Sequence, residues 1–96
     1  MQLELDPNVV NELREQADSG TPPSKLISII GDRLGLENTN FRLLAVAYFR
    51  EAFGLSLADA SQVGAASVFP EGSWSDIQLD NTISPLIQQN RDLWKR

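Results

Sequence analysis

The sequence has 96 residues, of which 42% are hydrophobic and 22% charged, a composition that predicts one globular domain spanning residues 1–96. It contains neither cysteine nor histidine, which excludes disulfides, thiolate metal sites and nucleophilic sites built on Cys–His or Ser–His pairs. We therefore expect no cofactor and no enzymatic activity.

The acidic residues are unevenly distributed along the chain. The net charge is −5, and residues 51–90 hold five acidic residues and no lysine or arginine. Nucleic-acid binding is disfavoured, because phosphate contacts need clustered basic side chains. The charge favours a basic protein partner, although a solubilising surface would also explain it.

The N-terminus and the hydrophobic pattern bear on localisation. Residues 1–6 lack the basic and apolar regions of a signal peptide. No apolar run reaches the roughly 18–20 residues that a membrane span requires. We expect a cytoplasmic protein that does not contact membranes.

Two helices are predicted before the centre of the chain. An Asp-Pro pair at residues 6–7 supplies an N-cap and a proline at the first helical position, and Gly20 ends this helix, which covers about 7–18. A second helix is predicted over about 22–34. The polar residues 38–40 are predicted to cap the helix that follows.

The stretch 41–53 is the predicted centre of the fold. Its apolar residues recur at helical spacing and cover nearly the whole circumference, which indicates a helix surrounded by others. Only a narrow strip marked by Arg42, Val46 and Arg50 is expected to reach solvent. Gly54 is predicted to end the helix.

The rest of the chain also reads as helical. Ser56 caps a predicted helix of small residues over about 57–64, Ser75 begins a short helix with a capping box, and Pro85 starts the last helix. The inward stripe of the last helix comprises Leu86, Ile87, Asn90, Leu93 and Trp94. The predicted fold class is all-α, a compact bundle of five to six short helices around the central helix at about 41–53.

Four carboxylates are candidates for binding. Asp76 and Asp80 are four residues apart and share a helix face, so with Asp59 or Glu71 they could bind a divalent cation through oxygen. The spacing is not that of a calcium-binding loop, and such pairs are common on exposed helices. We therefore expect no metal site.

Two arginines interrupt the apolar centre of the chain. Arg42 and Arg50 lie two turns apart on the polar strip of the central helix. We expect them to pair with nearby acids such as Glu51, Glu12 or Glu15. The alternative is an anion site or a contact with a partner.

The aromatic residues after the helix of small residues allow two interpretations. Phe69 and Trp74 lie in a loop that contains proline and glycine. They either plug the end of the core or form an exposed anchor for a partner, a role in which tryptophan is common. Trp94, on the stripe of the last helix, is predicted to be core.

Several segments of the C-terminal half resemble small bacterial all-α proteins of the immunity-protein type. They are residues 49–60, 74–76, 83–87 and 91–94. The shared motifs are mostly structural, namely helix caps, proline starts and core aromatics. Some such small acidic proteins are the immunity partners of secreted toxins.

These observations favour a protein-binding role. The first hypothesis is an immunity protein that neutralises a basic secreted toxin by occluding it. The partner-binding residues predicted for this role are Asp59, Glu71, Trp74, Asp76 and Asp80. The alternative hypothesis is a homodimeric structural or regulatory helical module without catalytic activity.

Overall fold

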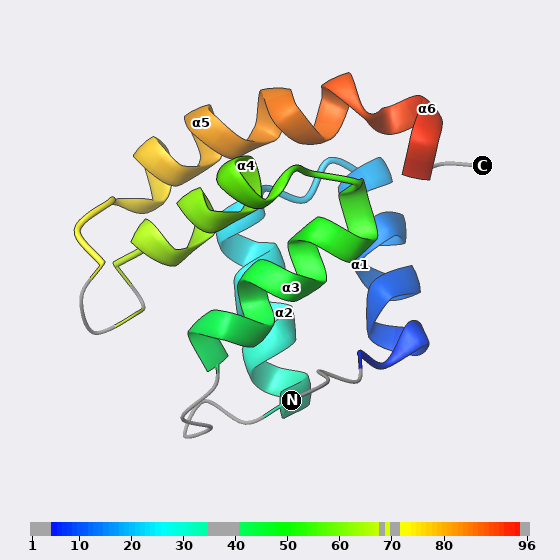
Figure 1. Ribbon diagram of the computed structural model, residues 1–96, viewed down its shortest axis with the longest axis horizontal. Helices are drawn as coiled ribbons and strands as arrows, with labels where there is room; N and C mark the ends of the chain where they lie inside the picture. The colour runs from blue at the N-terminus through cyan, green and yellow to red at the C-terminus, as the bar shows by residue number, and fades with distance from the viewer. Residues whose placement is uncertain (1–4, 35–40, 68, 70–71, 95–96) are drawn as a thin grey trace.

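Figure 1 shows the helices of the computed structural model, which describes residues 5–34, 41–67, 69 and 72–94. The elements are α1 (Pro7–Asp18), α2 (Pro23–Leu34), α3 (Phe41–Phe53), α4 (Leu57–Ser61), the 3-10 helix η1 (Gln62–Ala65), α5 (Asp76–Gln89) and α6 (Arg91–Trp94). The predicted all-α bundle around a central helix is therefore confirmed. None of the helices in these ranges combines the length and the apolarity needed to cross a membrane.

The first helix begins and ends as its sequence predicts. The Asp6 carboxylate accepts a hydrogen bond from the backbone nitrogen of Asn8 at 2.9 Å and so caps α1. At the other end Gly20 has a φ of 94°, a left-handed conformation that favours glycine. The turn is closed by the Thr21 nitrogen, which donates to the Gln16 carbonyl at 3.0 Å.

The C-terminal end of α3 is held by two side chains from distant parts of the sequence. Gly54, with a φ of 65°, ends the helix as predicted. The side-chain amide of Asn90 donates to the carbonyls of Phe53 and Gly54, each at 3.2 Å. Arg14 of α1, which precedes α3 in the sequence, donates a hydrogen bond from its Nε to the carbonyl of Ala52 at 2.8 Å. These bonds satisfy carbonyls that a helix end otherwise leaves without partners.

Large aromatic side chains of α3 form the middle of the core. Tyr48, Phe49 and Phe53 are at most 1% exposed. Phe53 packs edge-to-face on Phe49 at a centroid distance of 5.6 Å and on Trp94 at 5.3 Å. The Trp94 indole donates to the carbonyl of Ile87 at 2.9 Å, so its one polar group is satisfied inside the core. The prediction that Trp94 is core is confirmed.

One predicted helix boundary is wrong. Pro85 does not start the last helix; it lies inside α5, which runs without a break from Asp76 to Gln89. The capping box predicted at Ser75 is present and begins this longer helix. Leu79, Ile83 and Ile87 are all buried, so one apolar stripe continues past the proline.

The central helix is less enclosed than its sequence predicts. Leu43 is 51% exposed, and Val46 and Ala47 are only partly buried, so the solvent-facing side of α3 is wider than a narrow polar strip. Leu93, predicted to face inward from the last helix, is 58% exposed. The predicted cap at residues 38–40 lies outside the described residues.

Candidate functional site

Asp80, one of the predicted partner-binding residues, is occupied by a structural contact. Its two carboxylate oxygens accept hydrogen bonds from the backbone nitrogen of Ser24 at 2.8 Å and from the Ser24 hydroxyl at 3.0 Å. Ser24 lies in the first turn of α2, where backbone nitrogens lack partners within the helix. Asp80 therefore acts as an N-terminal cap that α5 supplies to α2.

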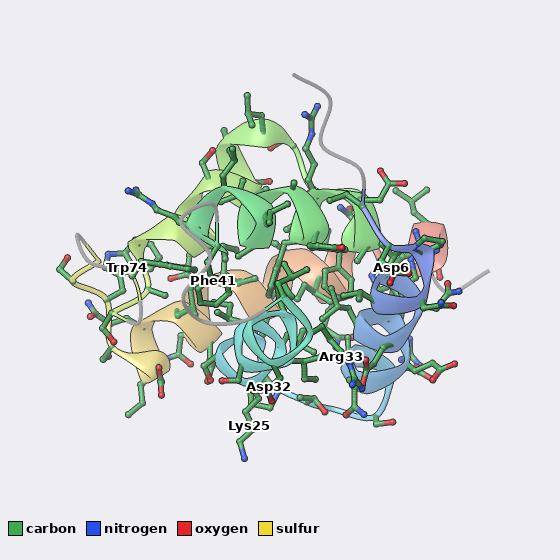
Figure 2. All side chains as sticks on the ribbon, turned by 90° about the horizontal axis from the view of Figure 1, so that it is seen from below. Asp6, Lys25, Asp32, Arg33, Phe41 and Trp74 are labelled. Atoms are coloured by element: carbon green, nitrogen blue, oxygen red, sulfur yellow. The ribbon has the colours of Figure 1, made fainter. Side chains whose placement is uncertain are left out.

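Trp74 and Phe69 are mainly packing residues. Phe69 is 2% exposed and meets the ring of Phe41 edge-to-face at 5.0 Å. Trp74 is half-buried and packs against the core. Its backbone is bound on both sides, because its nitrogen donates to the carbonyl of Ala65 and its carbonyl accepts from the nitrogen of Ser67, each at 2.9 Å. Figure 2 shows Trp74 at one end of the molecule, far from Asp6.

Asp59 and Asp76 occupy equivalent places in two different helices. Asp59 lies in the first turn of α4, where Ser56 caps the helix by accepting from the Asp59 nitrogen at 3.1 Å. Asp76 is exposed in the first turn of α5. A carboxylate in the first turn interacts favourably with the helix dipole, so both acids have a local structural role.

The predicted residues do not gather on one surface. Figure 2 shows α4, which carries Asp59, and α2, which Asp80 contacts, on opposite sides of α3. Glu71 lies outside the described residues. Within the residues that the structure describes, no three carboxylates are grouped so that they could hold a metal ion. What remains of the predicted site is Trp74 with the neighbouring Asp76.

An open apolar groove that was not predicted from the sequence lies on the surface of the described part of the chain. It lies along the outer side of α3 and the start of α4. Leu43 and Leu57 face it and are 51% and 59% exposed. The groove encloses about 550 Å³. Its wall residues are Leu5, Leu43, Val46, Ala47, Arg50, Glu51, Gly54, Leu55 and Leu57, and beside Leu43 it continues to Arg42 and Ser61.

The charged rim of the groove is mainly basic. Arg50 and Glu51 line its wide part, and Arg42 lines its continuation beside Leu57. Arg42 lies over Gly64 of η1, where an added methyl group would come within 2.8 Å of its Nε atom. The glycine therefore leaves room for the arginine to lie against η1.

The sequence of α3 is compatible with this groove, but it is equally compatible with a helix that is fully enclosed. A helix that is apolar around most of its circumference is either enclosed or has one face available to a partner. Leu57 gives an equally ambiguous signal: it is a large apolar residue in the first helical position of a helix otherwise made of small and polar residues. Nothing in the local pattern says that it faces away from the core.

A further exposed apolar residue lies three residues after Trp74 in the sequence. Ile77, in the first turn of α5, is 73% exposed. It follows Asp76 directly, so an apolar and an acidic side chain are both accessible near the half-buried tryptophan. This small acidic patch, formed by Trp74, Asp76 and Ile77, is the part of the predicted site that remains on the surface.

The resolved pKa shifts belong to a structural ion pair. Arg33 of α2 makes two hydrogen bonds of 2.9 Å with the carboxylate of Glu12 in α1. The hydrogen bonds lower the pKa of Glu12 and raise that of Arg33. Glu12 was predicted among the partners of Arg42 and Arg50, but it pairs with Arg33 instead. The pair joins α1 to α2, and neither of its residues lines the groove.

No protein family model, no curated protein and no solved structure matches this chain.

Proposed function

We propose that this protein is a protein-binding module without catalytic activity, of the immunity type, which occludes a basic partner protein. The observation that carries the proposal is the open groove along α3 and α4. Burying a leucine side chain fully is worth about 1.5–3 kcal/mol, yet Leu43 and Leu57 are more than half exposed. A contiguous apolar groove with a charged rim is the usual anatomy of an interface.

The charge of the chain supports the nature of the partner. A net charge of −5 attracts a basic protein over distances that short-range contacts do not reach. Under this proposal long-range attraction brings the partner to the surface, and the groove supplies the apolar contact that slows its release.

The acidic patch of Trp74, Asp76 and Ile77 is a second candidate for the docking surface. The exposure of Ile77 at 73% is the observation that favours it. A tryptophan beside an exposed apolar residue is a frequent centre of an interface, and Asp76 suits a basic partner.

Titration calorimetry with the product of the neighbouring gene tests the proposal and separates the two surfaces. We expect binding to weaken as salt concentration rises, because the long-range attraction is screened. Leu43→Ser with Leu57→Ser should lower the affinity at least about tenfold if the groove is the docking surface, since two anchors are lost. Asp76→Asn with Ile77→Ser is the matched pair for the acidic patch.

The outcomes also address the alternative of a homodimer. Absence of binding, or binding indifferent to both pairs of substitutions, contradicts the proposal. Sedimentation of the protein alone then decides whether the groove is covered by a second copy, because a mass that rises with concentration and falls in the Leu43/Leu57 variant identifies self-association.

A further inference from the structure

The placement of basic residues around the groove is unusual for this chain. Between Leu34 and Asn90 the sequence contains two basic residues, Arg42 and Arg50. Both line the apolar groove on α3. An otherwise acidic half of the molecule therefore has its positive charges at the one apolar groove described above.

The geometry of α3 sets the spacing of these charges. Arg42 and Arg50 are eight residues apart, which corresponds to about 12 Å along a helix. Leu43 and Val46 lie between them on the exposed side, and Leu57 of α4 faces them from the other wall. The groove thus offers an apolar floor about two turns long with a positive charge toward each end.

The two arginines are held differently. Arg42 lies against η1, over Gly64, so its guanidinium is positioned by the fold. Arg50 is exposed in the last turn of α3 and lines the wide part of the groove. Glu51 follows it at the groove edge, while the backbone carbonyl of Glu51 accepts from Arg14 at 3.1 Å. One arginine is preorganised and the other can adjust to a ligand.

We propose that the groove binds an amphipathic helix of the partner, with its apolar face on Leu43, Val46 and Leu57 and with carboxylates about two turns apart facing Arg42 and Arg50. This inference rests on the proposed function, because it names the segment of the partner that enters the groove. Helices bind such grooves through apolar side chains at i, i+3, i+4 and i+7. Carboxylates beside the two arginines fix the register of the helix in the groove.

The charge that the groove favours in its ligand is opposite to the charge that the whole molecule favours in its partner. The net charge of −5 favours a basic protein, whereas the groove favours an acidic rim on the segment that enters it. Both conditions are met by a basic partner that contributes one amphipathic helix with acidic flanks. A lysine-flanked helix would place like charges against Arg50 and is disfavoured.

Three designed peptides test this inference on the intact protein. Each is a fluorescent amphipathic helix of about 14 residues with the same leucine face, and the two flanking positions about two turns apart are both Glu, both Gln or both Lys. At low salt we expect the Glu peptide to bind about fivefold more tightly than the Gln peptide, and the Lys peptide to bind most weakly. High salt should remove most of this difference.

Substitutions connect the preference to the groove. Arg50→Gln should abolish the advantage of the Glu peptide over the Gln peptide, while Leu57→Ser should weaken all three peptides. Lys25→Gln, at an exposed basic residue of α2 that does not line the groove, is the matched control and should change none of the affinities. All three positions are exposed, so thermal unfolding by circular dichroism should show that each variant folds.

Definite results would overturn the inference. Equal affinities for the three peptides, tighter binding of the Lys peptide, no binding, or a Glu preference that survives Arg50→Gln each contradict it. If the partner needs Leu43 and Leu57 but the peptides show no charge preference, this inference fails and the proposed function stands. If the Glu peptide binds more tightly but substitution of Leu43 and Leu57 does not change the affinity for the partner, the proposed function fails instead.

Discussion

Several polar side chains of this protein act as helix caps for a helix other than their own. Asp80 caps the start of α2 through Ser24, and Asn90 and Arg14 bond to the carbonyls that end α3. Each of these contacts spans 36 residues or more in sequence. At the scale of single residues, the polar groups thus hold the helices in position relative to one another.

Replacing Asp80 tests this structural role. Asp80→Ala removes both acceptors of Ser24 and leaves a backbone nitrogen at the start of α2 without its partner. We expect the free energy of unfolding to fall by about 1–2 kcal/mol in urea titrations, as for the loss of other helix caps. Asp32→Ala, an exposed acid on α2, is the control and should change it by no more than about 0.5 kcal/mol. If the Asp80→Ala variant keeps its stability but binds the partner more weakly, Asp80 belongs to the binding surface and does not act as a cap.

The caps also show what the sequence can predict at this scale. Asp6, Ser56 and Ser75 cap their own helices, and each was predictable because the bond spans two or three residues. Asp80 was expected to face a partner, since its bond to Ser24 spans 56 residues and depends on how α5 packs against α2. Local chemistry identifies a cap, but only the fold shows which helix it serves.

At the scale of helices, α5 shows how one residue type can mislead. A proline after a serine is typical of a helix start, but packing can also stabilise a helix that contains a proline at an exposed interior position. The buried residues Leu79, Ile83 and Ile87 recur every four residues across Pro85. Their burial outweighs the hydrogen bond to the carbonyl of Asn81 that a proline cannot make.

The proline therefore destabilises a helix that the rest of its sequence supports. Pro85 is exposed, so Pro85→Ala removes no buried contact and restores a backbone donor inside α5. We expect the free energy of unfolding to rise by on the order of 1–2 kcal/mol, the gain in the helix being partly offset by the freer unfolded chain. Chemical denaturation measures this, with Gln88→Ala on the same helix as the control. A loss of stability would show that the proline ring is needed for the shape of α5.

The open side of α3 was harder to foresee than its buried side. Phe41, Tyr48 and Phe49 were predicted to be core and are buried. Leu43 was also expected to be covered, but it is 51% exposed and lines the open groove together with Leu57 of α4. Hydrophobicity identifies residues that favour burial, whereas the path of the neighbouring helices decides which of them are covered.

At the scale of the whole molecule, two ion pairs join the outer helices around α3. Arg33 of α2 bonds to Glu12 of α1, and Arg91 of α6 bonds to Asp18 at the end of α1. Figure 2 shows Arg33 directed from α2 toward α1. Both pairs are partly exposed, so each adds little to stability in comparison with the aromatic core. Their main effect is on the orientation of α1 in the bundle and not on the stability of the fold.

The Glu12–Arg33 pair gives the stability of the molecule a pH dependence whose sign can be stated. Hydrogen bonds from Arg33 lower the pKa of Glu12 in the folded state below its ordinary value of 4.5. The contribution of the pair is therefore complete above that value and is lost as pH falls through the lower pKa of the folded state. We expect the difference in unfolding free energy between the unsubstituted protein and Glu12→Gln to be largest near neutral pH and to close below about pH 4.5. Glu15→Gln, an exposed acid on the same helix, is the control, and denaturant titrations across this range measure both differences. A Glu12 difference that persists unchanged well below pH 4.5 would show that the side chain acts through packing and not through its charge.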